Sequence, residues 1–162
     1  MKFLKIALSL VIVFLTVGFS TAAFAGASAQ TTSVVVPLTF SQFIPCAHQG
    51  NGEIVDFSGS LHIVTSSTVN GNNVHLNQLF NPQGAKGIGE TTGDVWEATG
   101  ETRQDMTASN VNSFPFETTF VNNFRLINGK EGSFTVHENS HITVNADGTT
   151  AVSQDNLTMT CK

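Results

Sequence analysis

The chain carries few basic residues and few charges of any kind. Seven lysines and arginines stand against twelve aspartates and glutamates, and charged residues make up 12% of the sequence. Two of the seven, Lys2 and Lys5, lie at the N-terminus, so the rest of the chain holds five basic and twelve acidic residues, a formal net charge of −7. An acidic surface repels phosphate backbones, which argues against nucleic acid as a partner.

Tyrosine is absent and cysteine is scarce. Cys46 and Cys161 are the two cysteines, so a single intramolecular pairing exists, and there is no C-x-x-C spacing for a metal or redox site. Low charge density, no tyrosine and abundant Thr, Ser, Asn, Val and Phe are typical of exported β-proteins rather than helical ones. We therefore predict a Cys46–Cys161 disulfide, formed after export.

Long apolar runs are missing beyond the N-terminus, so no later stretch can span a membrane. Lys2 and Lys5 precede an apolar segment over residues 6–19, and two A-x-A sites follow, ending at Ala25 and Ala29. This order is that of a secretory signal peptide, and the apolar run is shorter than the roughly 20 residues that a span needs. We expect residues 1–29 to be a cleaved signal, residues 30–162 to form one domain, and the protein to be secreted; which A-x-A site is cut stays open.

Hydrophobic residues alternate with a period of two along most of the mature chain, as they do in half-buried strands. Turn sequences separate the alternating segments, and Asn-Gly and Asp-Gly pairs are among them. The pattern predicts strands over residues 33–40, 54–68, 73–80, 84–91, 95–103, 105–111, 116–127, 133–145 and 150–161.

Two hairpins can be aligned by their turns. A two-residue turn at 70–71 sets Leu61 opposite Phe80, and one at 147–148 sets Phe134 opposite Cys161. In both alignments apolar residues face apolar residues, whereas a slip by one residue would reverse the faces.

Eight or nine short-linked strands predict an antiparallel meander, and closing the sheet on itself removes its exposed edges. Cys46 follows the first predicted strand and Cys161 ends the last, so the disulfide would join the two edges. We predict an all-β fold, an antiparallel meander closed into an approximately eight-stranded barrel, with a two-sheet β-sandwich as the alternative.

The segment from His137 to His141 reads H-E-x-x-H, the signature of zinc metalloproteases. That chemistry needs a helix, because only there do residues four apart share a face and reach one zinc. Both flanks alternate with period two and an Asp-Gly turn follows, which favours a strand with the two histidines about 13 Å apart and Glu138 on the opposite face. We predict no metal site and no cofactor.

Polar residues interrupt the apolar face of the last three predicted strands. With a turn around Lys130, Asn122 lies beside Glu138, and Ser140 lies opposite Asp155. Acids that are close together in an apolar setting commonly have a raised pKa and mark a site. The predicted ligand cavity has eight residues, of which Glu138 and Asp155 are candidate catalytic acids: Trp96, Phe120, Asn122, Phe124, Val136, Glu138, Ser140 and Asp155. A solvent-facing polar network is the alternative.

Several segments resemble a family of small secreted bacterial proteins, largely actinobacterial, that carries no assigned activity. They are Ile44–Ala47, Ser67–Asn72, Asn81–Gly84 with Thr92–Asp94, Asn122–Ile127 and His141–Gly148. In architecture alone, the meander is similar to the barrels of allene-oxide cyclases and dirigent proteins, with no motif to transfer.

Three functions fit these features. The first is a binding protein that holds a small hydrophobic molecule in the barrel. The second is an extracellular structural or interaction protein with a filled core, and the third is a cyclase or isomerase that uses Glu138 or Asp155 for proton transfer. The sequence alone leaves the ligand, an enzymatic role and the oligomeric state open.

Overall fold

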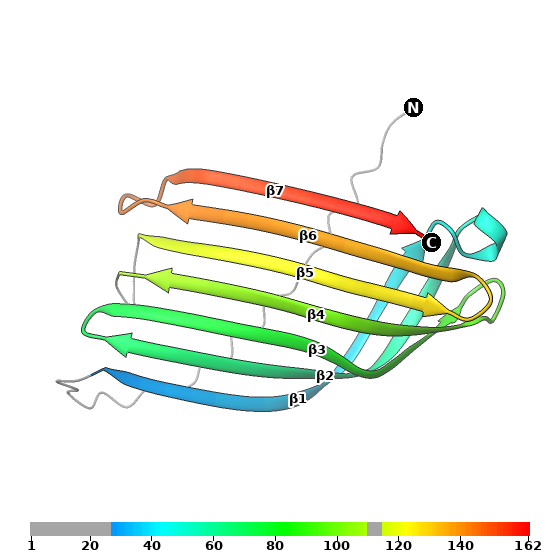
Figure 1. Ribbon diagram of the computed structural model, residues 1–162, viewed down its shortest axis with the longest axis horizontal. Helices are drawn as coiled ribbons and strands as arrows, with labels where there is room; N and C mark the ends of the chain where they lie inside the picture. The colour runs from blue at the N-terminus through cyan, green and yellow to red at the C-terminus, as the bar shows by residue number, and fades with distance from the viewer. Residues whose placement is uncertain (1–26, 110–114) are drawn as a thin grey trace.

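The computed structural model describes residues 27–109 and 115–162. In these ranges seven strands and a one-turn 3-10 helix, η1 (His48–Gly50), follow one another. The strands are β1 (Ser28–Ile44), β2 (Glu53–Asn70), β3 (Asn73–Gly89), β4 (Val95–Ala108), β5 (Phe116–Asn128), β6 (Gly132–Val144) and β7 (Thr150–Cys161). All seven form one antiparallel sheet in sequence order (Figure 1). The all-β meander is confirmed, and the sandwich alternative is wrong because there is one sheet.

Most of the predicted signal peptide, residues 1–26, lies outside the described residues, as do residues 110–111 of one predicted strand. Strand β1 begins at Ser28, inside the second A-x-A site, and pairs from there with Val69 of β2. No helix within the described ranges is long and apolar enough to cross a membrane.

Two pairs of predicted strands are in fact single strands. Residues 73–80 and 84–89 belong to β3, with 90–91 in the turn that follows, and residues 95–103 and 105–111 lie largely in β4. The Pro82–Gly84 segment is an irregularity within β3, where Gly84 has a φ of +60° and the register to β4 shifts between Phe80 and Lys86. Glycine and proline mark bulges as well as turns, which is why the sequence pattern predicted a break there.

The β6–β7 register is confirmed, with Phe134 opposite Cys161, and it departs from the prediction beside the turn, where Val144 pairs with Thr150. The β2–β3 register is shifted by two residues, because Leu61 faces Pro82 rather than Phe80. The loop of this hairpin is residues 71–72, since 70 and 73 are paired. Glycine then stands first in the loop, with a φ of +59°, as a type II′ turn requires. A shift by two leaves every side chain on its predicted face.

The sheet is open: β1 and β7 are its edges and no ladder joins them within the described ranges. Because the number of antiparallel strands is odd, the two edges run in the same direction. At one end the first two strands curl over, so that the loop after β1 lies beside the end of β7 (Figure 1). There the predicted disulfide joins Cys46 to Cys161, whose Cα atoms are 6.0 Å apart, across a separation of 115 residues.

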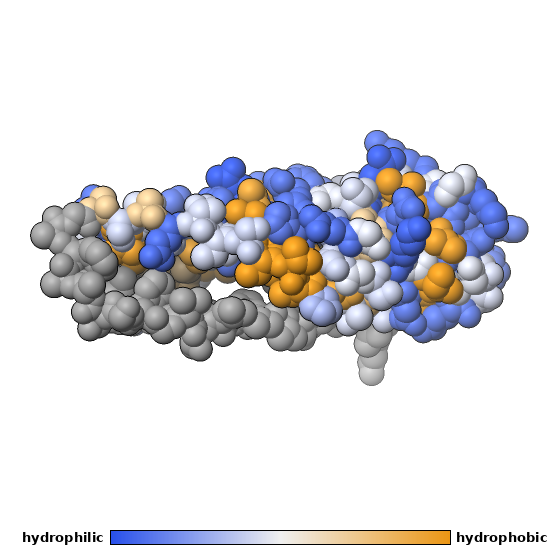
Figure 2. Space-filling view, turned by 90° about the horizontal axis from the view of Figure 1, so that it is seen from below, coloured by the Kyte–Doolittle hydropathy of each residue, from blue (hydrophilic) through white to orange (hydrophobic). Residues whose placement is uncertain are grey.

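The hydrophobic core fills this curled end. Nine buried residues form it: Ile44, Ala47, Val55, Phe57, Ala85, Trp96, Ala98, Leu126 and Phe134. Phe40 stacks on Phe57 with ring centroids 4.8 Å apart and meets Phe124 edge-on at 5.6 Å. The curl needs Gly59, because a Cβ there would lie 2.5 Å from the Cα of Ala85. The edge-on view of Figure 2 shows apolar side chains reaching the surface among polar ones.

Candidate functional site

A polar row crosses the inner, apolar face of the sheet. Thr102 of β4 lies opposite Asn122 of β5, and Asn122 lies opposite Glu138 of β6, as the sequence predicted for the second pair. The Thr102 hydroxyl donates a hydrogen bond to Asn122 Oδ1 at 2.9 Å. On β7, Asp155 lies opposite Ser140 and therefore diagonal to Glu138, again as predicted. We call Thr102, Asn122 and Glu138 the polar row.

Aromatic and aliphatic side chains flank the polar row. Phe120 precedes Asn122 on the same face and lies opposite Ser140, and Phe124 follows it and lies opposite Val136. Phe124 and Val136 also pack against the core of the curled end. The register therefore brings seven of the eight predicted cavity residues onto one contiguous surface of β5, β6 and β7.

Trp96 does not belong to this surface. Its side chain is completely buried in the core at the curled end, where it fills space and leaves no face for a ligand. The other seven predicted residues lie on the face of a sheet that is open in the described residues. One open hollow of about 420 Å³ is lined by Thr39, Phe40, Ser41, Asp56 and Phe57, away from the polar row. The candidate site is thus an open surface.

The carboxyl of Glu138 on this surface has a raised pKa. Burial among apolar side chains raises the pKa of its carboxyl above the ordinary value, and repulsion from Asp155 raises it further. Hydrogen bonding by Asn122 to the carboxylate lowers the pKa and offsets part of this effect. The neutral acid, which can donate a hydrogen bond or a proton, therefore persists to a higher pH than for a solvated glutamate.

The Glu138→Gln variant should be slightly more stable than the wild type at pH 7, by about 1 kcal/mol or less because the group is only partly shielded from water. A raised folded-state pKa means that the wild type gains stability from this group below the unfolded-state pKa and loses it as pH rises through the folded-state value. Urea unfolding between pH 4 and pH 8 should show the two stability curves separating as pH increases. The exposed Glu90→Gln change is the control, and a Glu138→Gln variant that is less stable at pH 7 would contradict this assignment.

The H-E-x-x-H segment lies on β6, so the strand prediction is confirmed. His137 and His141 project from the outer face, opposite to Glu138, which lies in the polar row. His137 Nδ1 is hydrogen-bonded to Asn123 Oδ1 at 2.6 Å, and His141 Nδ1 to Thr119 Oγ1 at 3.0 Å. In the described part of the chain, no three His, Cys, Asp or Glu side chains come together in a way that could hold a metal ion. The zincin geometry is therefore not formed.

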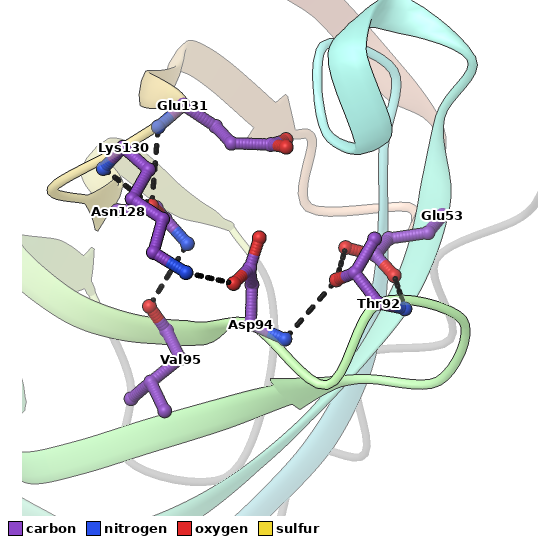
Figure 3. Close-up of polar contacts among 7 residues, drawn as sticks. All are labelled: Glu53, Thr92, Asp94, Val95, Asn128, Lys130 and Glu131. Carbon is purple, nitrogen blue, oxygen red and sulfur yellow. Dashed lines mark hydrogen bonds and ion pairs between the residues drawn. The ribbon is translucent and has the colours of Figure 1, made fainter.

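A second polar cluster, which the sequence did not predict, lies at the curled end (Figure 3). The carboxylate of Glu53, only 3% exposed, accepts hydrogen bonds from the backbone N–H groups of Thr91 and Thr92 at 3.2 and 3.0 Å and from the Thr92 hydroxyl at 2.9 Å. The Thr92 hydroxyl also accepts the backbone N–H of Asp94 at 3.0 Å. Glu53 thereby fastens the start of β2 to the β3–β4 turn.

The same turn is fastened to the β5–β6 turn. Asp94 binds Lys130 Nζ at 2.9 Å, which raises the pKa of that lysine. The side chain of Asn128 donates to the backbone carbonyl of Val95 at 3.1 Å and accepts the N–H groups of Lys130 and Glu131 at 2.7 and 3.1 Å. This network joins three connections at the end of the sheet and has the character of a structural support rather than a binding site.

No protein-family model, curated protein or solved structure matches the chain.

Proposed function

We propose that the protein is a secreted binding protein that holds a small hydrophobic molecule against the inner face of its sheet. The observation that carries the proposal is the half-buried surface of Phe120, Phe124 and Val136 around the polar row, which continues from the core of the curled end, where Phe40 of β1 contacts Phe124. Covering such apolar area stabilises a complex by about 25 cal/mol per Å² removed from water. We propose in addition that residues 1–29 are a signal peptide, that the protein is secreted, and that it belongs to the secreted bacterial family it resembles.

The polar row favours a ligand with one oxygen-bearing group. The Asn122 amide already donates one hydrogen bond to Glu138, and its second N–H is available to a ligand in a setting where water is partly excluded. Glu138 adds a donor whenever its carboxyl is protonated. A carbonyl, hydroxyl or carboxylic acid on an otherwise apolar molecule would accept a hydrogen bond from the remaining donor, whereas a pure hydrocarbon would shield that donor from water without replacing the bond, at a cost of about 1–3 kcal/mol. We therefore propose an apolar molecule with a single polar head as the ligand class.

We also propose that the sheet closes further toward a barrel when the ligand binds. The disulfide already holds the ends of β1 and β7 together at the curled end. A ligand bound on β4–β7 would gain apolar contacts if β1 and β2 curved further over it, and binding would then favour a more curved sheet. This would bring the free edges closer together.

A titration of the mature protein with a neutral apolar dye, N-phenyl-1-naphthylamine, tests the proposal. We expect saturable fluorescence enhancement with one site per chain and a Kd of about micromolar, as is usual for a small ligand on a surface that leaves one side open. Competition by medium-chain fatty acids or alcohols should displace the dye, because they share the apolar body and single polar head. Enhancement that does not saturate, or that requires unfolding of the protein, would contradict the proposal.

The alternative of a structural or interaction protein has one observation in its favour, the filled core at the curled end. It predicts no displaceable dye binding in the same titration. The enzyme alternative needs Glu138 or Asp155 as a proton donor or acceptor, and it becomes worth testing once a ligand has been identified.

A further inference from the structure

Strand β7 has one edge that pairs with no other strand in the described residues, and the loop after β1 meets β7 at Cys161 through the disulfide. Within residues 27–109 and 115–162 it pairs with β6 alone, and all twelve of its residues are exposed. Val152, Leu157 and Met159 are apolar residues on this strand with exposed fractions of 39%, 52% and 54%. An unpaired strand of this length presents a row of backbone donors and acceptors to any strand that can align with it.

The β6–β7 register identifies the free groups. Ser133 and Lys162 exchange both backbone hydrogen bonds, N–H of each to C=O of the other, at 2.7 and 2.9 Å. In an antiparallel ladder hydrogen-bonded pairs alternate with non-hydrogen-bonded pairs, so every second residue of β7 turns its N–H and C=O away from β6. The residues of this free row, counted back from Lys162, are Ser153, Asp155, Leu157, Met159 and Cys161.

The free row lacks the features that usually protect an edge. Between Thr150 and Cys161 there is no proline, lysine or arginine, and Asp155 is the single charged residue. The bulge at the β6–β7 turn falls before the free row. The other edge is different, because β1 carries Pro37 near its middle and proline removes a donor from the row. The two edges of the sheet are therefore not equivalent as pairing surfaces.

We propose that β7 pairs with β7 of a second copy of this chain, in an antiparallel arrangement with Leu157 on the two-fold axis. Leu157 is the midpoint of the free row, so this register alone uses all five of its residues: Ser153 meets the partner's Cys161, Asp155 meets the partner's Met159, and Leu157 meets its own copy. Asp155 then lies away from its symmetry mate, whereas a shift by two residues toward the N-terminus would place the two aspartates directly opposite each other. An isologous contact of this kind closes after two copies.

The dimer should be weak. Five pairs with two hydrogen bonds each give ten, the usual number for a protein interface, but a single strand edge buries less surface than a stable homodimer requires. We therefore expect a monomer–dimer equilibrium with a Kd of about 10–100 µM, a range typical of small, transient contacts. Two sheets joined in this way form one continuous fourteen-stranded sheet with both inner faces on the same side.

Sedimentation velocity on the mature protein between about 5 and 500 µM is the first test, with a concentration-dependent shift from monomer to dimer expected. Leu157→Lys should weaken dimerisation at least tenfold, because two lysines then face each other on the axis, and added salt should restore part of the loss. Thr158→Lys is the matched control, because it adds the same charge one residue away on the other face, opposite the partner's Asn156, and should dimerise like the wild type. A wild type that stays monomeric, or a Leu157→Lys variant that dimerises normally, would overturn the proposal.

Amide hydrogen exchange gives a second readout that needs no substitution. The amides of Ser153, Asp155, Leu157 and Met159 should exchange fast in dilute protein and slow down as concentration rises. Those of Gln154, Asn156 and Thr158, already bonded to β6, should change little. Protection that increases on β1 instead, or equally on both sets of amides, would place the contact elsewhere and refute the β7 pairing.

Discussion

Reduction of the Cys46–Cys161 disulfide should lower the free energy of unfolding by about 4–5 kcal/mol, the loop-closure value for a separation of 115 residues. A domain of this size is stable by about 5–15 kcal/mol, so the loss is a large fraction of the total. The physical reason goes beyond chain entropy, because the bridge joins the loop after β1 to the end of β7 over a core that includes Trp96. Without the disulfide, no covalent bond joins the β1 and β7 edges of the sheet at the curled end.

Urea unfolding followed by the fluorescence of Trp96, the one tryptophan of the chain, measures this loss directly. The double variant Cys46→Ser, Cys161→Ser should unfold at a much lower urea concentration than the oxidised wild type and should match the reduced wild type. Thiol titration of the unfolded, unreduced protein should find no free thiol. Two reactive thiols per chain, or equal stability of the oxidised and reduced forms, would contradict the bridge and its role.

Glu53→Ala should destabilise the protein by about 3 kcal/mol, although the residue lies outside the candidate binding surface. Its buried carboxylate accepts three hydrogen bonds from the β3–β4 turn. Removing it deprives the backbone N–H groups of Thr91 and Thr92 and the Thr92 hydroxyl of their acceptor. Bonds to a charged acceptor contribute about 1.5–3 kcal/mol. Glu53→Gln keeps one oxygen as an acceptor and should cost about half as much.

The exposed Glu90→Ala change is the control for Glu53, since surface substitutions usually stay within about 0.5 kcal/mol. Urea unfolding at pH 7 separates the three variants. The dye titration of the proposed function should be unchanged in Glu53→Ala at temperatures where the variant is folded. A Glu53→Ala protein as stable as the control would mean that the β3–β4 turn does not depend on this carboxylate.

Much of the fold could be predicted because strand patterning is local. The Asp147-Gly148 turn and the alternation on both sides of it were enough to place Phe134 opposite Cys161, and the turn around Lys130 was enough to place Asn122 beside Glu138. The β2–β3 hairpin was displaced by two residues because either dipeptide around Gly71 can form a tight turn. A shift by two residues leaves each side chain on the same face of the sheet, so the polar row could still be identified.

Closure of the sheet could not be predicted in the same way. It depends on how far successive strands twist and where bulges such as the one at Gly59 let them bend, and neither leaves a periodic signal. The burial of Trp96 follows from this curl, which places its side chain in the core and not on the surface that the other seven predicted residues share. Glu53 was missed for a related reason, because its partners Thr91 and Thr92 are nearly forty residues away and no motif connects them.

Thr102 completes the polar row and was also missed. Its strand, β4, is followed by a connection without a recognisable tight turn, so the β4–β5 register had no anchor in the sequence. Once the register is known, Thr102 falls opposite Asn122 and extends the row to a third strand. The polar row therefore extends beyond the three C-terminal strands that the sequence indicated.

The measurement that tests the central claim most directly is the dye titration of Phe120→Ser beside Val121→Ser. The two residues are neighbours on β5 and both half-buried, but Phe120 lies on the inner face with the polar row and Val121 lies on the outer face. The account predicts that Phe120→Ser weakens dye binding at least tenfold, which corresponds to about 1.4 kcal/mol, while Val121→Ser binds like the wild type. Equal binding by both variants, or a loss confined to Val121→Ser, would contradict a binding site on the inner face.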